Sequence, residues 1–215
     1  ASRVGVASTA SSIRPELPTR YFVMKCAVPE NVETSIEHGR WATSPTVSSA
    51  LSKAFAACDR VVLLFSNNTS NGFQGYATMQ SDIGAPSKLW NTATSLAGDF
   101  RVRWHAAGHL DFNALSAVLA NWDVLRHVRR SANGDELSSE IGHLICKHLD
   151  ATALKQGLYV MSESGRLERR PGAPSKSVDT RSRTYIDSRA YHGESTILTH
   201  LLICQHSNAR SKTAW

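Results

Sequence analysis

Apolar and polar positions along the first 150 residues follow patterns that predict strands and helices in mixed order. RYFVMKCA (20–27) is rich in aromatic and branched residues, and RVVLLFSN (60–67) is a short continuous apolar run typical of a strand buried on both faces. GFQGYATMQ (72–80) follows a cluster of Asn, Ser and Gly turn residues, and DFRVRWHA (99–106) alternates apolar and charged positions. These four segments are therefore predicted to be strands, with a hairpin before the third and Trp104 in the core.

Helical spacing and end signals predict the segments between the strands. PENVETSIEHG begins with a proline and acidic residues and ends at Gly39, and SPTVSSALSKAFAACD spaces apolar residues three and four apart. LSAVLANW, which ends at Trp122, and EIGHLICKHLDATAL are also expected to be helices. VLRHVRRSANGDEL is interpreted as an extended basic stretch that leads into an Asn-Gly turn. This order predicts a mixed α/β domain whose strands curl into a small barrel.

The two ends of the chain differ from this domain in composition. Residues 1–19 are rich in Ser and Ala with two prolines, which predicts a flexible arm, and the main domain is expected over 20–150. Residues 151–215 form a basic C-terminal extension, mostly polar and loop-like, in which the apolar stripe of TILTHLLIC (196–204) is suited to dock on the domain. The first residue is Ala rather than Met, which indicates a processed or excised piece of a longer protein.

Charge and cysteine usage narrow the function classes. The net charge is +6, but residues 1–150 carry 14 Lys and Arg against 13 Asp and Glu, while residues 151–215 carry 10 against 5. Bulk charge is therefore no argument for nucleic-acid binding by the main domain. The four cysteines are far apart, so reduced thiols of an intracellular protein, nuclear or cytoplasmic, are expected rather than disulfides or a zinc site.

Several functions lack their sequence signatures. The chain has no leader and no long apolar run, so no membrane association is expected. It has no Gly-rich phosphate loop, no His-x-Glu metal motif and no nucleophile elbow, so we expect no enzymatic activity, no metal and no cofactor.

Two tryptophans lie in sequence surroundings that do not predict a buried core position. Trp41 follows the end of a predicted helix, and Trp90 lies in a Ser- and Thr-rich loop, neither with flanking hydrophobic periodicity. Two parallel indole faces about 7 Å apart would hold one flat ring or one small methylated group between them. Such a cage suits either a methylated base or a methylated ammonium group.

The ordered series of motifs is more specific than the tryptophans alone. RYFVMK, GRWATS, VVLLFS, GFQGYATM, a lone Trp, DFRVRW and an NGDEL turn together resemble the YTH domain, the family of readers of N6-methyladenosine in RNA. The resemblance runs from about residue 20 to residue 149. It implies an α/β fold with a curved, six-stranded, barrel-like sheet packed by helices, and no catalysis.

The resemblance also implies roles for individual residues. The cage walls would be Trp41, Trp90 and Leu96, with Met79 and Leu89 as alternatives for the third wall. Base-edge recognition would fall to the Asn31 amide, to the main-chain carbonyl of Cys26 and to Ala42. The RNA backbone would be held by Lys25 and Arg129, with Arg126 and Arg130 standing in for an arginine that is replaced here by Ala132.

The expected function is therefore binding of N6-methyladenosine in single-stranded RNA. Two alternatives remain open: an aromatic-cage reader of methylated lysine, for which only Asp99 and Glu37 offer a nearby carboxylate, and a less selective binder of single-stranded nucleic acid. Besides RNA, protein partners would engage regions outside this chain.

Overall fold

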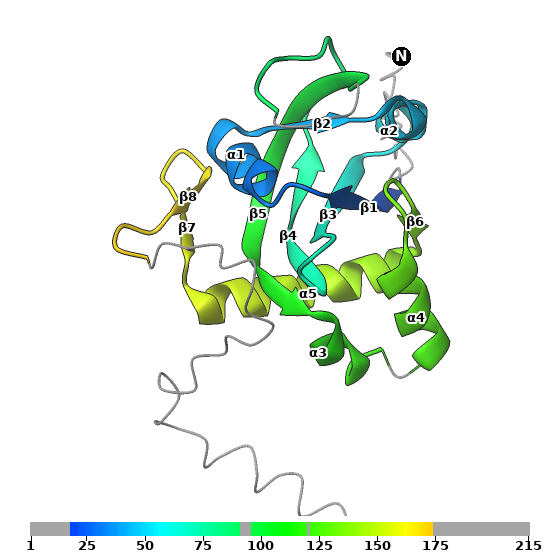
Figure 1. Cartoon of the computed structure of the whole chain (residues 1–215), viewed down its shortest axis with the longest axis vertical. Helices are drawn as coiled ribbons and strands as arrows, with labels where there is room; N and C mark the ends of the chain where they lie inside the picture. Colours follow the sequence, from blue (N-terminus) through cyan, green and yellow to red (C-terminus); the bar gives the residue numbers. More distant parts are fainter. Residues whose placement is uncertain (1–17, 91–95, 120, 174–215) are drawn as a thin grey trace, which may run out of the picture. The chain divides into compact units, whose positions relative to one another are not determined.

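The computed structural model describes residues 18–90, 96–119 and 121–173, which form a six-stranded sheet covered by helices (Figure 1). The strands of this sheet are β1 (Thr19–Cys26), β2 (Arg40–Thr43), β3 (Arg60–Asn67), β4 (Gly72–Met79), β5 (Gly98–Asp111) and β6 (Glu136–Leu137). The helices are α1 (Glu30–His38), α2 (Pro45–Ala57), α3 (Phe112–Ser116), α4 (Trp122–Arg130) and α5 (Ser139–Gln156). A separate hairpin follows, made of β7 (Tyr159–Met161) and β8 (Leu167–Arg169).

The sheet has the order β2-β5-β4-β3-β1-β6. β1 and β3 are parallel, and the other neighbouring strands are antiparallel. The four predicted strands and the mixed α/β class are confirmed, and the strand number matches the six that the resemblance implied. The sheet is open rather than closed into a barrel, because β2 and β6 form its two edges within the described chain.

Two apolar clusters pack against the sheet, and β3 contributes to both. Its odd-numbered residues 61, 63 and 65 join the cluster that contains Trp41 and Trp104, while residues 62 and 64 join the cluster under α5. This double burial confirms the prediction from its continuous apolar run. Trp104 is 3% exposed, as predicted for the core, and its indole N–H donates to Ser35 Oγ at 3.0 Å.

The end signals of α1 act as predicted. Gly39 takes a left-handed conformation with φ of +62°, and its N–H donates to Ser35 O at 2.9 Å. A residue without a Cβ adopts this conformation at little cost, so the chain turns sharply from α1 into β2.

The region between β5 and α5 differs from the prediction. Residues 124–130, expected to be extended, belong to α4, and the expected helix over LSAVLANW is replaced by the short α3 and a turn. Asn121 starts α4 by accepting a hydrogen bond from Asp123 N at 2.8 Å, and Leu125 and Val128 are buried three residues apart. Trp122, predicted to be a structural residue at a helix end, is instead the first residue of α4 and is 66% exposed.

The described part of the C-terminal extension is more ordered than the predicted loop. It completes α5 and then forms the β7–β8 hairpin, which lies beside α1 and β5 (Figure 1). Leu167 is 8% exposed and joins the apolar cluster of Trp41. The predicted arm up to residue 17 and the apolar segment 196–204 lie outside the described residues. Among the described residues, no helical segment combines the length with the apolar character that a membrane span requires.

Candidate functional site

Trp41 is fixed in the sheet. It lies in β2 opposite Phe100 of β5, is 5% exposed, and meets the ring of Phe65 edge to face with 4.7 Å between centroids. The sequence placed Trp41 just after a helix but did not predict the four-residue strand that buries it. One member of the pair of tryptophans is therefore held rigidly by the core.

Trp90 is half-buried and lies in the loop between β4 and β5, beside Trp41. The two indole rings are 5.5 Å apart between centroids and inclined by 66°. The edge-to-face contact is an arrangement that aromatic rings favour when they touch directly, and it differs from the parallel plates about 7 Å apart that a sandwiched base needs. Since Trp41 is locked by its neighbours, opening such a gap requires the Trp90 ring to turn.

The third predicted wall lies at the end of the same loop. Leu96 is half-buried, and the N–H of the next residue, Ala97, donates to Thr43 O at 2.9 Å. This bond ties the backbone beside Leu96 to the end of β2, two residues after Trp41. Of the alternatives, Met79 is buried at the end of β4 and Leu89 is half-buried.

A carboxylate network supports both tryptophan-bearing segments. The side chain of Asp99 is 1% exposed; it accepts hydrogen bonds from Arg40 Nε at 3.1 Å and from Ser87 Oγ at 2.6 Å. Burial opposes ionisation of Asp99, but the bonds from Arg40 and Ser87 prevail and hold its pKa below the ordinary value. The Arg40–Asp99 pair joins β2 to β5, and Ser87 attaches the loop that carries Trp90.

The predicted base-edge residues lie on three elements. Asn31 is in the first turn of α1 and is 9% exposed. The Cys26 carbonyl, at the end of β1, already accepts Asn68 N–H at 3.0 Å, so only its second lone pair is available to another donor.

Ala42 offers a different backbone environment. It lies on the edge strand β2, opposite Asp99, and the two residues form a non-hydrogen-bonded pair of the antiparallel ladder. Gly39 O accepts a hydrogen bond from Val102 N, and hydrogen-bonded pairs alternate with non-hydrogen-bonded pairs along an antiparallel ladder. The carbonyl of Ala42 therefore points away from β5. Ala42 is therefore better placed than Cys26 to accept a hydrogen bond from outside the sheet.

Two of the four predicted backbone cations share one pocket. Lys25 and Arg129 both line a pocket of about 670 Å³ whose other walls include Asn68, Asn71 and Asn133. Lys25 Nζ donates to Ser66 Oγ at 3.0 Å and lies 5.6 Å from the Phe112 ring centroid. Burial lowers the pKa of Lys25, against the opposing attraction of Asp135. A partly desolvated ammonium beside a second cation is suited to bind an anion.

The other two cations lie elsewhere on α4. Arg126 is exposed and pairs with Asp123 at 3.0 Å, and Arg130 is exposed; neither lines the pocket of Lys25 and Arg129. Ala132 does line it, in the turn before β6. The side chain that reaches the pocket beside Ala132 is therefore Arg129, held by Asn71 Oδ1 at 3.3 Å.

Sequence reasoning missed the pairing of Arg40 with Asp99. Each residue directly precedes an aromatic residue, Trp41 or Phe100, and the two aromatic residues face each other across β2 and β5. The charged residue before each aromatic residue is visible in the sequence, but it predicts an ion pair only once the register of β2 and β5 is known.

Comparisons with known proteins agree with this architecture. A family model described as YTH: YT521-B-like domain matches residues 19–150. The chain is similar to zinc finger CCCH domain-containing protein 45 of Oryza sativa subsp. japonica, with 31% identity over 140 residues, 63% of this chain and 21% of that protein. It likewise spans less than half the length of other curated relatives found.

Solved structures give the same result. The crystal structure of the Toxoplasma CPSF4 YTH-domain in complex with a 7 mer m6A-modified RNA matches with a TM-score of 0.56 and 34% identity, covering 63% of this chain and 93% of that chain. The Pho92 YTH domain in complex with m6A matches with a TM-score of 0.55 and 25% identity, covering 62% and 86%.

Proposed function

The chain belongs to the YTH family, and from this premise we propose that it binds N6-methyladenosine in single-stranded RNA. The methylated base enters a cage of Trp41, Trp90 and Leu96, and basic residues hold the flanking backbone. Binding alone, without a chemical step, is the proposed role. An intracellular location, nuclear or cytoplasmic, goes with such a partner.

The contact between Trp41 and Trp90 carries the proposal. It joins a rigid indole in β2 to a half-buried indole in a loop, with 5.5 Å between ring centroids. Turning the Trp90 ring until it is parallel to Trp41 would replace one ring–ring contact with two ring–base contacts, and stacking is worth about 1–3 kcal/mol per base. The solved complexes of the Toxoplasma and Pho92 domains with methylated ligands support the same use of the fold here.

Recognition of the base edge is assigned to two groups. The Asn31 amide donates to a ring nitrogen, and because it is neutral its desolvation costs less than that of a charge. The single remaining hydrogen of the methylated exocyclic nitrogen needs one acceptor, and the Ala42 carbonyl at the sheet edge supplies it better than the partly occupied Cys26 carbonyl.

The methyl group sets the selectivity. Burying one methyl contributes roughly 1 kcal/mol by area, and pockets discriminate one such group by about 10- to 200-fold. Stacking acts on methylated and plain adenine nearly alike, so it raises affinity for both. The base must leave its stack to enter the cage, which favours single-stranded RNA.

The network around Asp99 argues against a methyl-lysine reader. A cage for a methylated ammonium gains from a free carboxylate nearby, because the ligand keeps its positive charge. The Asp99 carboxylate is already paired with Arg40 and hydrogen-bonded to Ser87. A neutral modified base fits this electrostatic environment better.

A binding titration tests the proposal. The full chain is titrated with a short RNA carrying one N6-methyladenosine, with the same RNA lacking the methyl, and with a trimethyl-lysine peptide. Preference for the methylated RNA by about 10-fold or more is expected. Equal binding of the two RNAs would make the chain a general single-strand binder, and preference for the peptide would make it a lysine reader; either result rejects the proposal.

A further inference from the structure

Three arginine side chains line one pocket of about 410 Å³ between the end of α1, strand β5 and the β7–β8 hairpin. Arg101 and Arg103 occupy the exposed positions of β5, alternating with the buried Phe100, Val102 and Trp104. The third cation, Arg166, comes from the hairpin, outside the segment that the family model matches.

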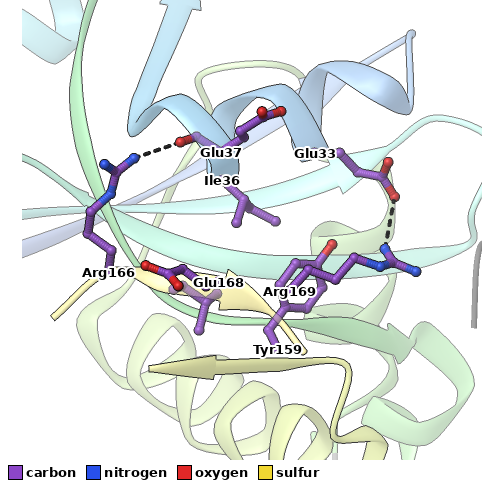
Figure 2. Close-up of a pocket in the computed structure, with 8 residues that line it drawn as sticks. Glu33, Ile36, Glu37, Tyr159, Arg166, Glu168 and Arg169 are labelled. Atoms are coloured by element: carbon purple, nitrogen blue, oxygen red, sulfur yellow. Dashed lines mark hydrogen bonds and ion pairs between the residues drawn. The ribbon is translucent and has the colours of Figure 1, made fainter. Parts of the chain in front are cut away.

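The hairpin is anchored so that Arg166 is held at this place. Leu167 is buried in the cluster of Trp41, and Arg166 Nη2 donates to Glu37 O at the end of α1 at 2.6 Å. Figure 2 shows this bond on one side of the hairpin and the Arg169–Glu33 ion pair of 3.8 Å on the other. The hairpin is therefore fixed to α1 at two points.

The hairpin turn also lies against Arg103. A Cβ placed on Gly165, whose φ is +74°, would be 3.2 Å from Arg103 Nη2. Glycine at this position lets the guanidinium approach the turn closely, and the turn brings Arg166 to the same pocket. Two guanidinium groups from distant parts of the chain thus share one small space.

The charge of this pocket is one-sided. None of the described residues that line it is Asp or Glu, and neither Arg101 nor Arg103 has an ion-pair partner among the residues that the structure describes. Gln80 and Ser164 add neutral hydrogen-bonding groups to the lining. Guanidinium groups bind phosphate oxygens with two parallel hydrogen bonds, so this lining is suited to a phosphate.

The basic row begins beside the tryptophans. Arg101 lies directly opposite Arg40 in the β2–β5 register, and Arg40 precedes Trp41. Residues two apart on a strand are about 7 Å apart and point to the same face, so Arg101 and Arg103 form one line, while Trp41 and Phe100 point to the other face of the sheet. β2 is an edge strand, so a polyanion that leaves the cage and passes around this edge meets Arg101 first and then Arg103 with Arg166.

We propose that Arg101, Arg103 and Arg166 form a second RNA-backbone site, which binds phosphates of the strand that flanks the methylated nucleotide. The site is separate from the pocket of Lys25 and Arg129. It rests on the proposed function, because its ligand is the RNA whose methylated base occupies the cage. It gives the hairpin a role in RNA affinity without a role in methyl selectivity.

The test compares charge-matched double variants of the full chain. Arg101→Gln/Arg103→Gln removes two positive charges from the pocket, and Lys53→Gln/Arg60→Gln removes two from exposed positions outside it. Each protein is titrated across a salt series with a methylated nonanucleotide and with the N6-methyladenosine nucleoside alone. Thermal melting of each variant confirms that it is folded.

We expect the pocket variant to bind the nonanucleotide about 5- to 10-fold more weakly, with a salt slope reduced by about 0.7 for each phosphate that the pocket no longer binds. Its affinity for the nucleoside should equal that of the unchanged protein. Arg166→Gln should reproduce a smaller decrease of the same kind.

The inference is overturned if the pocket variant and the Lys53/Arg60 variant bind the nonanucleotide with the same affinity and the same salt slope. In that case methyl-dependent binding persists, so the proposed function still stands. Equal affinity of the unchanged chain for methylated and unmethylated RNA would instead reject the proposed function. A phosphoserine peptide that binds the wild-type chain but not the pocket variant, with RNA binding unchanged, would assign the pocket to a protein partner and overturn the RNA site.

Discussion

Arg40 Nε donates a 3.1 Å hydrogen bond to Asp99 Oδ2, and this pair joins the strand of Trp41 to the strand that follows the loop of Trp90. Ser87 binds the same carboxylate at 2.6 Å from within that loop. One buried carboxylate therefore fixes the relative position of both segments that carry the proposed cage. Its protonation should affect folding and binding together.

Replacing Asp99 with Asn should reduce the acid sensitivity of the fold. The pKa of Asp99 is lower in the folded chain than its ordinary value of 3.8, so its ionisation stabilises the fold fully above that value, and this contribution is lost as the pH falls through the lower folded pKa. Urea unfolding from about pH 2.5 to about pH 6 should show a smaller loss of unfolding free energy for Asp99→Asn than for the unchanged chain.

Asp59→Asn, at an exposed position, is the matched control and should keep the acid response of the unchanged chain. The lowered pKa values of Asp82 and Glu136 contribute an acid response common to all three proteins. Identical pH profiles for the Asp99 and Asp59 variants would contradict the role given to Asp99.

Removing the Trp90 indole should abolish methyl dependence with little loss of stability. Trp90 is half-buried in a loop and packs on the outside of the core cluster, so Trp90→Ala removes a cage wall and less buried surface than Trp41→Ala does. Trp41→Ala, at 5% exposure against Phe65, should also destabilise the fold by about 3–5 kcal/mol, which makes it the less informative variant.

Trp122→Ala is the control, because that indole is 66% exposed on α4. Paired titrations with methylated and plain RNA, beside thermal melts, check all three variants. Retained methyl preference in Trp90→Ala would remove Trp90 from the cage, and its unfolding would assign that ring to the core.

Neutralising Lys25 or Arg129 should weaken RNA binding without changing methyl selectivity. Both line one pocket, so Lys25→Gln and Arg129→Gln should each reduce the salt slope of RNA binding by about 0.7. Arg126→Gln should have a smaller effect, because Arg126 is exposed and paired with Asp123 outside that pocket. Fluorescence anisotropy across a salt series measures the slopes; equal slopes for all three variants would reject the special role of the pocket.

Truncating Leu167 should show that the β7–β8 hairpin is part of the fold. Leu167 is 8% exposed within the cluster of Trp41, so Leu167→Ala should cost about 2–5 kcal/mol of stability. Leu154→Ala, at 86% exposure on α5, should change stability little. Equal melting temperatures for the two variants would mean that the hairpin is only loosely attached.

The sequence by itself determined the elements whose signals are local. The continuous apolar run of β3, the alternation along β5 and the terminating Gly39 of α1 each act within one segment, and the structure confirms each of them. The ordered motif series also sufficed to indicate the family, since it does not depend on how the strands are paired.

Only the tertiary structure decided how these segments meet. The four residues of β2 are too few for a periodic pattern, and the Arg40–Asp99 pair and the ring contact of Trp41 with Trp90 depend on its register with β5. The β7–β8 hairpin and its Arg166 owe their place to burial of Leu167 among residues from distant strands. Such contacts lower the free energy only after the chain has folded, so no local pattern of apolar and polar residues encodes them.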